Sequence, residues 1–371
     1  MLILVRCNDV ASDPRAMKYV NYLRANNKLY KLIAWDRDGR VQDESEGYFL
    51  KKRAGYNVGG IKAVLNRIIW MWFVLKRLIK MKEKAPVIHA CDLDAAFPSA
   101  VYKVFFNKKS KLIFDVFDWY SATLYNQGAI VLKAFAMMEK FSVKHSDKII
   151  ICEPERIEQI PYPIPNEQLL VLPNIPCFAD SSFLVESDNY KFQNDLITFS
   201  YVGGFSTERC LSEIIALAED GIINLAIAGF GNVEIEHRLE RLSGCSNVKY
   251  YGKVAYTDGL NIMYNSDIIY AMYAKSNPNH IYAAPNKFYE AMFLGKPIFS
   301  TSGTIVAKKI DSLGIGFTSE ESKNDIFEII KTIDKSESLN KGMISKLMWD
   351  TEYKTYTIDF LNNEYRALLV N

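Results

Sequence analysis

The sequence predicts an α/β protein with two doubly wound parallel sheets, and three observations support this fold class. The chain has 371 residues, which exceeds the usual length of one domain. Short apolar runs rich in β-branched residues recur along both halves, each followed by a polar loop and a segment with helical spacing. These runs are apolar along their whole length, which is typical of strands that helices cover on both faces.

Six strands are predicted in each half of the chain. In the first half they cover residues 2–5, 30–35, 87–91, 111–116, 148–152 and 169–172. In the second half they cover residues 197–202, 224–228, 248–251, 267–272, 297–300 and 315–318. The prolines between residues 161 and 176 mark the division, with residues 180–188 as a linker. We therefore expect domains over residues 1–175 and 190–345, and a helical segment over residues 346–371.

Charge is distributed unevenly along the chain. The 45 Lys and Arg residues nearly balance the 43 Asp and Glu residues, and the formal net charge of +2 argues against a nucleic-acid partner. Between residues 51 and 86, however, ten Lys and Arg residues face a single acid, Glu83. That segment carries a charge of +9, and the remaining chain carries −7.

Simple counts exclude several other classes of protein. The longest apolar run, residues 68–75, is far shorter than the roughly 20 residues of a transmembrane helix. The N-terminus turns polar at Cys7, so we expect no signal peptide. Six cysteines lie far apart and only four histidines are present, so we expect neither a metal site nor a disulfide framework.

Two glycine-bearing loops follow strands of the second half. Gly203 and Gly204 follow the strand at 197–202, and a helix starting near Glu208 would aim free N–H groups at an anion. Arg209 offers a side-chain contact to phosphate, although a plain tight turn is the alternative. The next strand ends in a similar loop with Gly229 and Gly231. Two such loops in adjacent units favour a nucleotide ligand.

Residues 273–297 carry the most informative pattern. Pro285 suits the first turn of a helix, which places Asn286 and Lys287 near its positive end. Lys287 is a candidate diphosphate clamp there. Glu290, one turn further on, could accept hydrogen bonds from ribose hydroxyls, although a solvated helix face is the alternative.

These segments together resemble a known family. In order, SYVGGFSTER, NLAIAGFGN, NVKYYGKV and PNKFYEAMFLGKP resemble the donor half of a GT-B glycosyltransferase, close to glycosyltransferase family 4. In the first half, NDVASDPRAMKYVNYLR, VIHACDLDA, LIFDVFDWYS, ICEP and VLPN resemble the acceptor domain of that family. The resemblance implies two Rossmann-like domains facing across a cleft, with a C-terminal helix that crosses back to the first domain.

The resemblance also implies roles for individual residues on the donor side. Glu290 matches the second Glu of the family's E-x7-E motif and would bind the ribose, while Lys253 and Val254 would border the base. The donor-binding set implied in this way is Gly203, Gly204, Arg209, Gly229, Gly231, Lys253, Val254, His280, Tyr282, Asn286, Lys287 and Glu290. Two departures affect the donor sugar: Tyr282 replaces the first Glu of the motif, and Gly204 replaces a frequent Arg.

Polar residues after the strands of the first half are candidates for the acceptor side. Asp13 and Arg15 are expected to bind the acceptor, and Asp118 or Asp94 to orient its hydroxyl during catalysis. Phe117 stands where many relatives have a His. Capping of the following helix is the alternative for each carboxylate. His89 is interpreted as a core histidine.

A helix with two apolar faces is predicted over residues 61–81. One stripe is expected to pack on the sheet: Ile61, Val64, Leu65, Ile68, Ile69, Trp72, Leu75 and Ile79. A second set, with Trp70 and Phe73 beside Arg77 and Lys80, is expected to face an anionic membrane surface. A helix buried on both faces is the alternative.

The combined expectation is a retaining, metal-independent glycosyltransferase of hexosyl type. It would transfer a sugar from a UDP- or GDP-linked donor, without a further cofactor, to a saccharide acceptor linked to a polyprenyl diphosphate, in surface polysaccharide biosynthesis. The expected location is cytoplasmic, peripheral on the inner face of the cell membrane. A nucleotide-sugar epimerase and a non-catalytic GT-B partner subunit are the alternatives.

Overall fold

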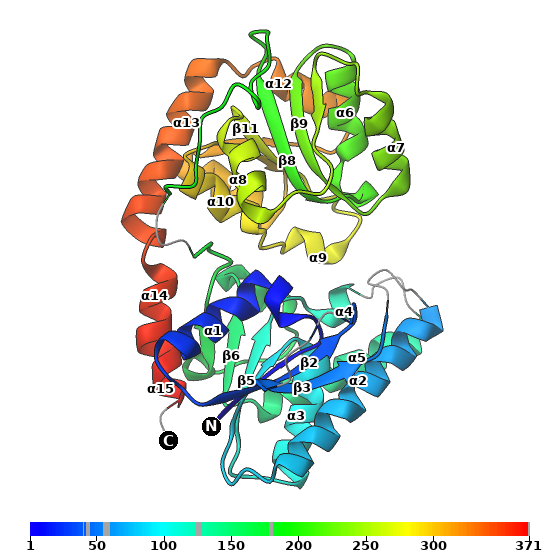
Figure 1. Ribbon diagram of the computed structural model, residues 1–371, viewed down its shortest axis with the longest axis vertical. Helices are drawn as coiled ribbons and strands as arrows, with labels where there is room; N and C mark the ends of the chain where they lie inside the picture. The colour runs from blue at the N-terminus through cyan, green and yellow to red at the C-terminus, as the bar shows by residue number, and fades with distance from the viewer. Residues whose placement is uncertain (40, 42–44, 55–59, 124–127, 178–180, 370–371) are drawn as a thin grey trace. The chain divides into compact units, whose positions relative to one another are not determined.

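The computed structural model describes residues 1–39, 41, 45–54, 60–123, 128–177 and 181–369, without the side chains of residues 12 and 60–63. The chain divides into two compact units (Figure 1). One comprises Met1–Pro173 together with Thr357–Asn371, and the other comprises Asn174–Tyr356. Each unit contains one parallel sheet with helices on both faces, so the predicted α/β class is confirmed. Asp180, at the start of the expected linker, lies outside the described residues.

The first unit is built on a seven-stranded sheet in the order β3-β2-β1-β4-β5-β6-β7. Its strands are β1 (Leu2–Arg6), β2 (Tyr30–Asp36), β3 (Gly47–Lys51), β4 (Val87–Cys91), β5 (Lys111–Val116), β6 (Lys148–Ile151) and β7 (Leu169–Val171). Six of them were predicted. The edge strand β3 was missed because its apolar run, Tyr48–Leu50, is brief and is followed directly by Lys51, Lys52 and Arg53.

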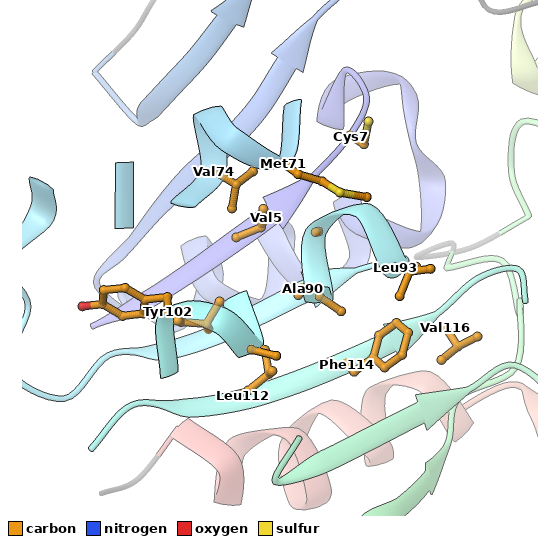
Figure 2. Close-up of a cluster of buried hydrophobic side chains, with 14 of the residues drawn as sticks. Val5, Cys7, Met71, Val74, Ala90, Leu93, Tyr102, Leu112, Phe114 and Val116 are labelled. Atoms are coloured by element: carbon orange, nitrogen blue, oxygen red, sulfur yellow. The ribbon is translucent and has the colours of Figure 1, made fainter. Parts of the chain in front are cut away.

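Helices cover both faces of this sheet. The helices α2 (Gly60–Met81), α3 (Leu93–Phe105) and α5 (Ala129–His145) share one apolar core with the strands, part of which Figure 2 shows. In that view Met71 and Val74 of α2 lie over Val5 of β1, and Leu93 of α3 lies near Phe114 of β5. The other face carries α1 (Pro14–Ala25) and the last residues of the chain, where Tyr19 of α1 contacts Tyr365.

The structure reverses the predicted orientation of α2. Trp70, Met71, Val74 and Leu78 are buried, and Trp70 stacks on Trp35 of β2 with ring centroids 6.1 Å apart. Most of the stripe that was expected to pack on the sheet is instead exposed, including Trp72, whereas Leu75 is partly buried against the core. Both faces are apolar, so periodicity could identify the stripes but not which one faces the sheet. The membrane role predicted for Trp70 is therefore wrong. The side chains of Ile61 and Lys62 lie outside the described residues.

The second unit contains a six-stranded sheet in the order β10-β9-β8-β11-β12-β13. All six strands were predicted: β8 (Thr198–Gly204), β9 (Asn224–Phe230), β10 (Val248–Tyr250), β11 (Ile268–Ala271), β12 (Ile298–Thr301) and β13 (Gly316–Ser319). One face packs against α6 (Leu211–Glu219), α7 (Val233–Arg241) and α12 (Lys323–Ile330). The other packs against α8 (Tyr256–Tyr264), α10 (Asn286–Leu294) and α11 (Ile305–Leu313).

The C-terminal residues connect the two units. Helix α13 (Lys335–Met348) packs beside α10 within the second unit. A single π turn (Trp349–Tyr353), α14 (Tyr356–Phe360), a second π turn (Leu361–Tyr365) and α15 (Arg366–Leu369) follow. Residues from Thr357 onward belong to the first unit, where Tyr365 is fully buried. The chain therefore ends inside the unit in which it began.

Candidate functional site

The carboxyl ends of β8 and β9 form the floor of a candidate site in the second unit. Gly203 pairs with Gly229 across these strands, so both glycines still belong to the sheet. Their φ angles are +153° and +148°, a region that L side chains rarely adopt. A Cβ atom on Gly229 would lie 1.9 Å from the carbonyl oxygen of Gly203. The two loops can therefore approach each other this closely only because position 229 is glycine.

Two cations lie beside this floor without a carboxylate partner. The Lys287 Nζ atom lies 4.8 Å from the centroid of the Tyr201 ring, and the Arg209 guanidinium lies 4.2 Å from that of Tyr273. Neither cation makes an ion pair within 4.0 Å among the described residues. The Nη1 atom of Arg209 is buried and has no hydrogen-bond partner among them. Buried donors without partners indicate a place for an anionic ligand.

The pKa of Lys287 reflects the same buried, positively charged environment. Burial lowers the pKa of its ammonium from 10.5 to about 8, and the nearby Arg209 contributes to the decrease, while Glu290 opposes it. An anion bound here would offset both effects. Lys287 lies in the first turn of α10, whose N-cap residue, Pro285, provides no side-chain cap. The free N–H groups of that turn add to the positive potential.

Glu290 lies one turn further along α10 and is almost completely buried. Tyr256, the first residue of α8, donates a hydrogen bond from its hydroxyl to Glu290 Oε1 over 2.8 Å. The solvated-face alternative for Glu290 is therefore wrong. Tyr256 was not identified from the sequence. Its position after β10, at the same edge of the sheet as the glycine loops, was the available signal.

The loop after β11 positions His280 beside the cations. A short helix, α9 (Pro278–Ile281), follows Asn277, which caps it. His280 Nδ1 lies 3.0 Å from the carbonyl oxygen of Ala274, and its Nε2 lies 3.7 Å from the carboxylate of Glu208. The imidazole also packs edge-on against Tyr273, the ring under Arg209. Tyr282 follows α9 and is partly buried, and Asn286 is exposed.

The remaining predicted donor residues lie on the β9 side of the site. Lys253 Nζ lies 4.8 Å from the centroid of the Phe230 ring, which is half exposed at the end of β9. Val254 packs against a small apolar cluster that includes Ala228. Gly231 has a φ angle of +121°. Phe230 was not identified from the sequence, although it lies between the two glycines of its loop. A half-exposed aromatic ring beside a cation suits a planar ligand group.

Arg15 lies in the interior of the first unit and does not face an acceptor. Its Nη2 atom lies 2.7 Å from Asp115 Oδ1, its Nη1 donates to the carbonyl of Leu172 over 2.7 Å, and both Arg15 and Asp115 are buried. Tyr19 also donates to Asp115. Burial raises the pKa of Asp115, but the Arg15 guanidinium and His89 outweigh it and hold the pKa well below its usual range. The structure thus corrects the expectation for Arg15: this cation stabilises the fold.

His89 connects this buried pair to the end of the chain. It is fully buried, as expected for a core histidine, and its Nδ1 lies 2.8 Å from the hydroxyl of Tyr365. Its Nε2 lies 3.4 Å from Asp115 Oδ2. His89, Cys91 and Asp115 also form a group of possible metal ligands in the described part of the chain. The Arg15 guanidinium already neutralises Asp115, so the group does not fit a cation.

The three aspartates predicted for the acceptor side differ in accessibility. Asp13 caps α1 through the N–H groups of Arg15 and Ala16 and pairs with Arg6 over 2.7 Å, so the capping alternative holds for it. Asp94 is buried and accepts a hydrogen bond from Tyr120 over 2.9 Å.

Asp118 is 52% exposed, and its carboxylate lies 3.4 Å from Arg156. Of the two catalytic candidates, therefore, only Asp118 presents its carboxylate to solvent, and the expectation for Asp94 is corrected.

A neighbouring residue, Asp92, adopts an uncommon backbone conformation. Its φ and ψ angles are +71° and 168°, a region that non-glycine residues rarely enter. Its carboxylate accepts N–H groups of Phe117 and Asp118 and pairs with Arg6. Burial raises its pKa to about 7, while Arg6 opposes the shift. These contacts hold the backbone that presents Asp118.

Comparison with known structures identifies the fold. The sequence matches no protein-family model and no curated protein. Sucrose-phosphate synthase from Thermosynechococcus elongatus has a TM-score of 0.74 at 13% identity, over 99% of this chain and 98% of that chain. UDP-forming α,α-trehalose-phosphate synthase from Burkholderia vietnamiensis has a TM-score of 0.68 at 10% identity, over 99% of both chains. WaaG, a glycosyltransferase involved in lipopolysaccharide biosynthesis, has a TM-score of 0.64 at 14% identity, over 95% of this chain and 96% of that chain.

The chain has the GT-B fold. At these identities the likeness establishes the fold alone, and the place in glycosyltransferase family 4 stays a prediction. Within this GT-B fold the second unit concentrates unpaired positive charge at the carboxyl edge of its sheet, where open α/β sheets bind ligands. The first unit exposes the carboxylate of Asp118 at the carboxyl edge of its own sheet.

Proposed function

We propose that the protein is a glycosyltransferase that transfers a sugar from a nucleotide-diphosphate sugar, UDP- or GDP-linked, to a saccharide acceptor. The observation that supports this most directly is the pair Lys287 and Arg209. Lys287 lies beside Gly203, Arg209 lies over Tyr273, and neither cation makes an ion pair with a carboxylate among the described residues. The GT-B fold is consistent with the activity.

The site suits the chemistry of the departing nucleotide. When the bond from the anomeric carbon to the diphosphate breaks, negative charge grows on the diphosphate, and positive groups held in place stabilise it. Lys287, Arg209 and the free N–H groups of α10 supply that charge, so we expect no requirement for an added metal. Glu290, oriented by Tyr256, would accept hydrogen bonds from the ribose. Phe230 and Lys253 would border the base.

On the acceptor side we assign the orienting role to Asp118. Its exposed carboxylate can accept the proton of the acceptor hydroxyl during attack. Same-face attack would retain the anomeric configuration and requires no separate nucleophile. His280, which Ala274 and Glu208 hold in place, is the candidate contact to the donor sugar. Its neighbour Tyr282 replaces the carboxylate that the family pattern has there.

We further propose that the acceptor is linked to a lipid, such as a polyprenyl diphosphate, and that the enzyme works in surface polysaccharide biosynthesis on the inner face of the cell membrane. The concentrated positive charge between residues 51 and 86 supports a negatively charged surface as partner. No helix in the described residues is long and apolar enough to cross a membrane.

The decisive experiment combines ligand binding with product analysis. Thermal unfolding would be followed with UDP, GDP and their glucose and N-acetylglucosamine derivatives, because a ligand of the folded state raises the melting temperature. We expect stabilisation by one nucleotide series and its loss in Lys287→Ala. Lys296→Ala is the matched control, since Lys296 also has a lowered pKa but packs on Tyr264.

The products distinguish the alternatives. A transferase releases the nucleotide and forms a glycoside only when an acceptor is present. Conversion of the donor to another sugar without an acceptor would indicate an epimerase. No stabilisation by any nucleotide or nucleotide sugar would contradict the proposal and favour a non-catalytic partner subunit.

A further inference from the structure

Helix α2 exposes an apolar stripe. Its members are Leu65 (54% exposed), Ile68 (54%), Ile69 (41%), Trp72 (65%) and Ile79 (37%). Their spacing of three, four and seven residues places them on one side of the helix. Single exposed apolar residues are common on protein surfaces, but five large ones on the outer face of one helix form a patch. Such a patch indicates an interaction site.

The stripe is not needed to hold α2 on the sheet. The opposite side of the helix already supplies Trp70, Met71, Val74 and Leu78 to the core of the first unit. Arg77 also turns toward the unit, where it lies over the rings of Tyr48 and Phe73. The outer stripe therefore remains available to a partner.

Exposed lysines flank the C-terminal half of this stripe. Lys76 is exposed and lies on the same side of the helix, between Trp72 and Ile79. Lys80, Lys82 and Lys84 are exposed at and beyond its C-terminal end. Glu83 is the one acid among residues 51–86. Two copies of this chain facing each other here would bring like charges together, which disfavours a dimer at this face.

We infer that the outer stripe of α2 docks the first unit on a bilayer of anionic phospholipid, with Trp72 at the level of the headgroups and the lysines against lipid phosphates. A tryptophan flanked by aliphatic residues and lysines is suited to that depth, where an apolar face is buried and cations remain hydrated. The inference rests on the proposed function only in that docking would give access to a lipid-linked acceptor. The outer stripe takes the place of the membrane surface that was predicted from the sequence around Trp70, which is buried.

Tryptophan fluorescence gives a direct test. The chain has five tryptophans, and four of them are buried: Trp35, Trp70, Trp119 and Trp349. A shift of emission to shorter wavelength on mixing with phosphatidylglycerol vesicles would therefore come from Trp72. We expect this shift with phosphatidylglycerol, a much smaller one with phosphatidylcholine alone, and its loss in Trp72→Phe although that variant still binds. An unchanged spectrum with both lipids would overturn the inference.

Co-sedimentation with the same vesicles tests the residues. The pair Ile68→Ser with Trp72→Ser should weaken binding by about tenfold or more, because each lost apolar side chain removes buried area at the interface. The matched control is Leu339→Ser with Met343→Ser, which removes two exposed apolar residues of α13 at the same spacing. Equal binding by wild type and the α2 variant, or an equal loss in the control, would contradict the inference.

Two further readouts keep this result separate from the proposed function. Each variant is first checked for an unchanged melting temperature and for stabilisation by nucleotide. If the wild-type protein is stabilised by nucleotide but does not bind vesicles, the docking surface is refuted and the proposed transferase function is unaffected. If it binds vesicles but is not stabilised by any nucleotide, the docking surface is supported and the proposed function is contradicted. If size-exclusion chromatography showed a dimer that the α2 variant dissociates, the stripe would be a protein interface and the inference would fail.

Discussion

The Lys287 Nζ atom lies 2.9 Å from the position that a Cβ atom on Gly203 would occupy. A side chain at position 203 would therefore force the ammonium group, the far end of the Lys287 side chain, to shift from its present position. The φ angle of +153° adds backbone strain for any other residue.

Gly203→Ala should consequently abolish stabilisation by the nucleotide and lower the free energy of unfolding by about 1–3 kcal/mol. Gly204→Ala is the control, because nothing lies within 4 Å of a Cβ atom there. Nucleotide titrations by thermal shift compare the two variants. Equal behaviour of both would mean that the loop does not bind the donor as proposed.

The pKa of Lys287 predicts two opposite effects of pH. Its folded-state value of about 8 lies below the usual 10.5, so between these values the unfolded chain binds a proton that the folded chain lacks. Stability should therefore rise with pH in this window. Affinity for an anionic nucleotide should fall over the same window, because binding requires the charged ammonium.

Lys287→Met isolates this effect, since it removes the titrating group and leaves all others. Thermal unfolding and nucleotide titration of both proteins are measured from pH 7 upward. The difference between wild type and variant gives the contribution of Lys287 to the pH dependence of stability and of nucleotide affinity. Parallel pH profiles for the two proteins would contradict the assignment.

The hydrogen bond from Tyr256 to Glu290 predicts an effect on donor binding. Tyr256→Phe removes the group that orients the carboxylate, so we expect a higher KM for the donor, a smaller change in kcat, and about 1 kcal/mol of lost stability. Tyr251→Phe is the matched control, because the Tyr251 hydroxyl is buried without a partner among the described residues. Its removal should leave KM unchanged and stability equal or higher. A KM effect of the same size in both variants would show that Tyr256 acts only through packing.

Most of the fold could be predicted from the sequence because its strands are largely apolar runs. Twelve of the thirteen strands in the described residues follow from this pattern, and the edge strand β3 escaped because its short run ends in cations. The orientation of α2 could not be predicted, since both of its faces are apolar and only contacts such as Trp70 with Trp35 decide between them.

The candidate site was predictable only in part. Glycines and Lys287 follow a local pattern, because strand, loop and helix N-terminus are adjacent in sequence. Tyr256 and Phe230 depend on which strands are neighbours in the sheet, and that order is not local. Arg15 illustrates the opposite error. A charged residue after a strand is a candidate for ligand binding, but Arg15 is buried in an ion pair with Asp115, which lies 100 residues away in the sequence.

The contrast between Asp115 and Asp118 provides the final prediction. Asp115→Asn leaves the Arg15 guanidinium buried without a counter-charge, which should lower the free energy of unfolding by about 3–5 kcal/mol. Asp118→Asn breaks only a partly exposed ion pair, and should change stability by less than about 1 kcal/mol.

If Asp118 orients the acceptor hydroxyl, its variant should nevertheless lose about 100-fold or more in kcat, with nucleotide binding unchanged. Denaturant unfolding and acceptor-dependent product formation, measured on both variants, separate the two roles. Because Asp115 has a depressed pKa, its contribution to stability should also decrease as pH falls below the usual range of Asp. This decrease should be seen in wild type and in Asp118→Asn, but not in Asp115→Asn. Full activity of Asp118→Asn would remove that carboxylate from the mechanism, and unchanged stability of Asp115→Asn would contradict the buried pair as the element that holds Arg15 inside.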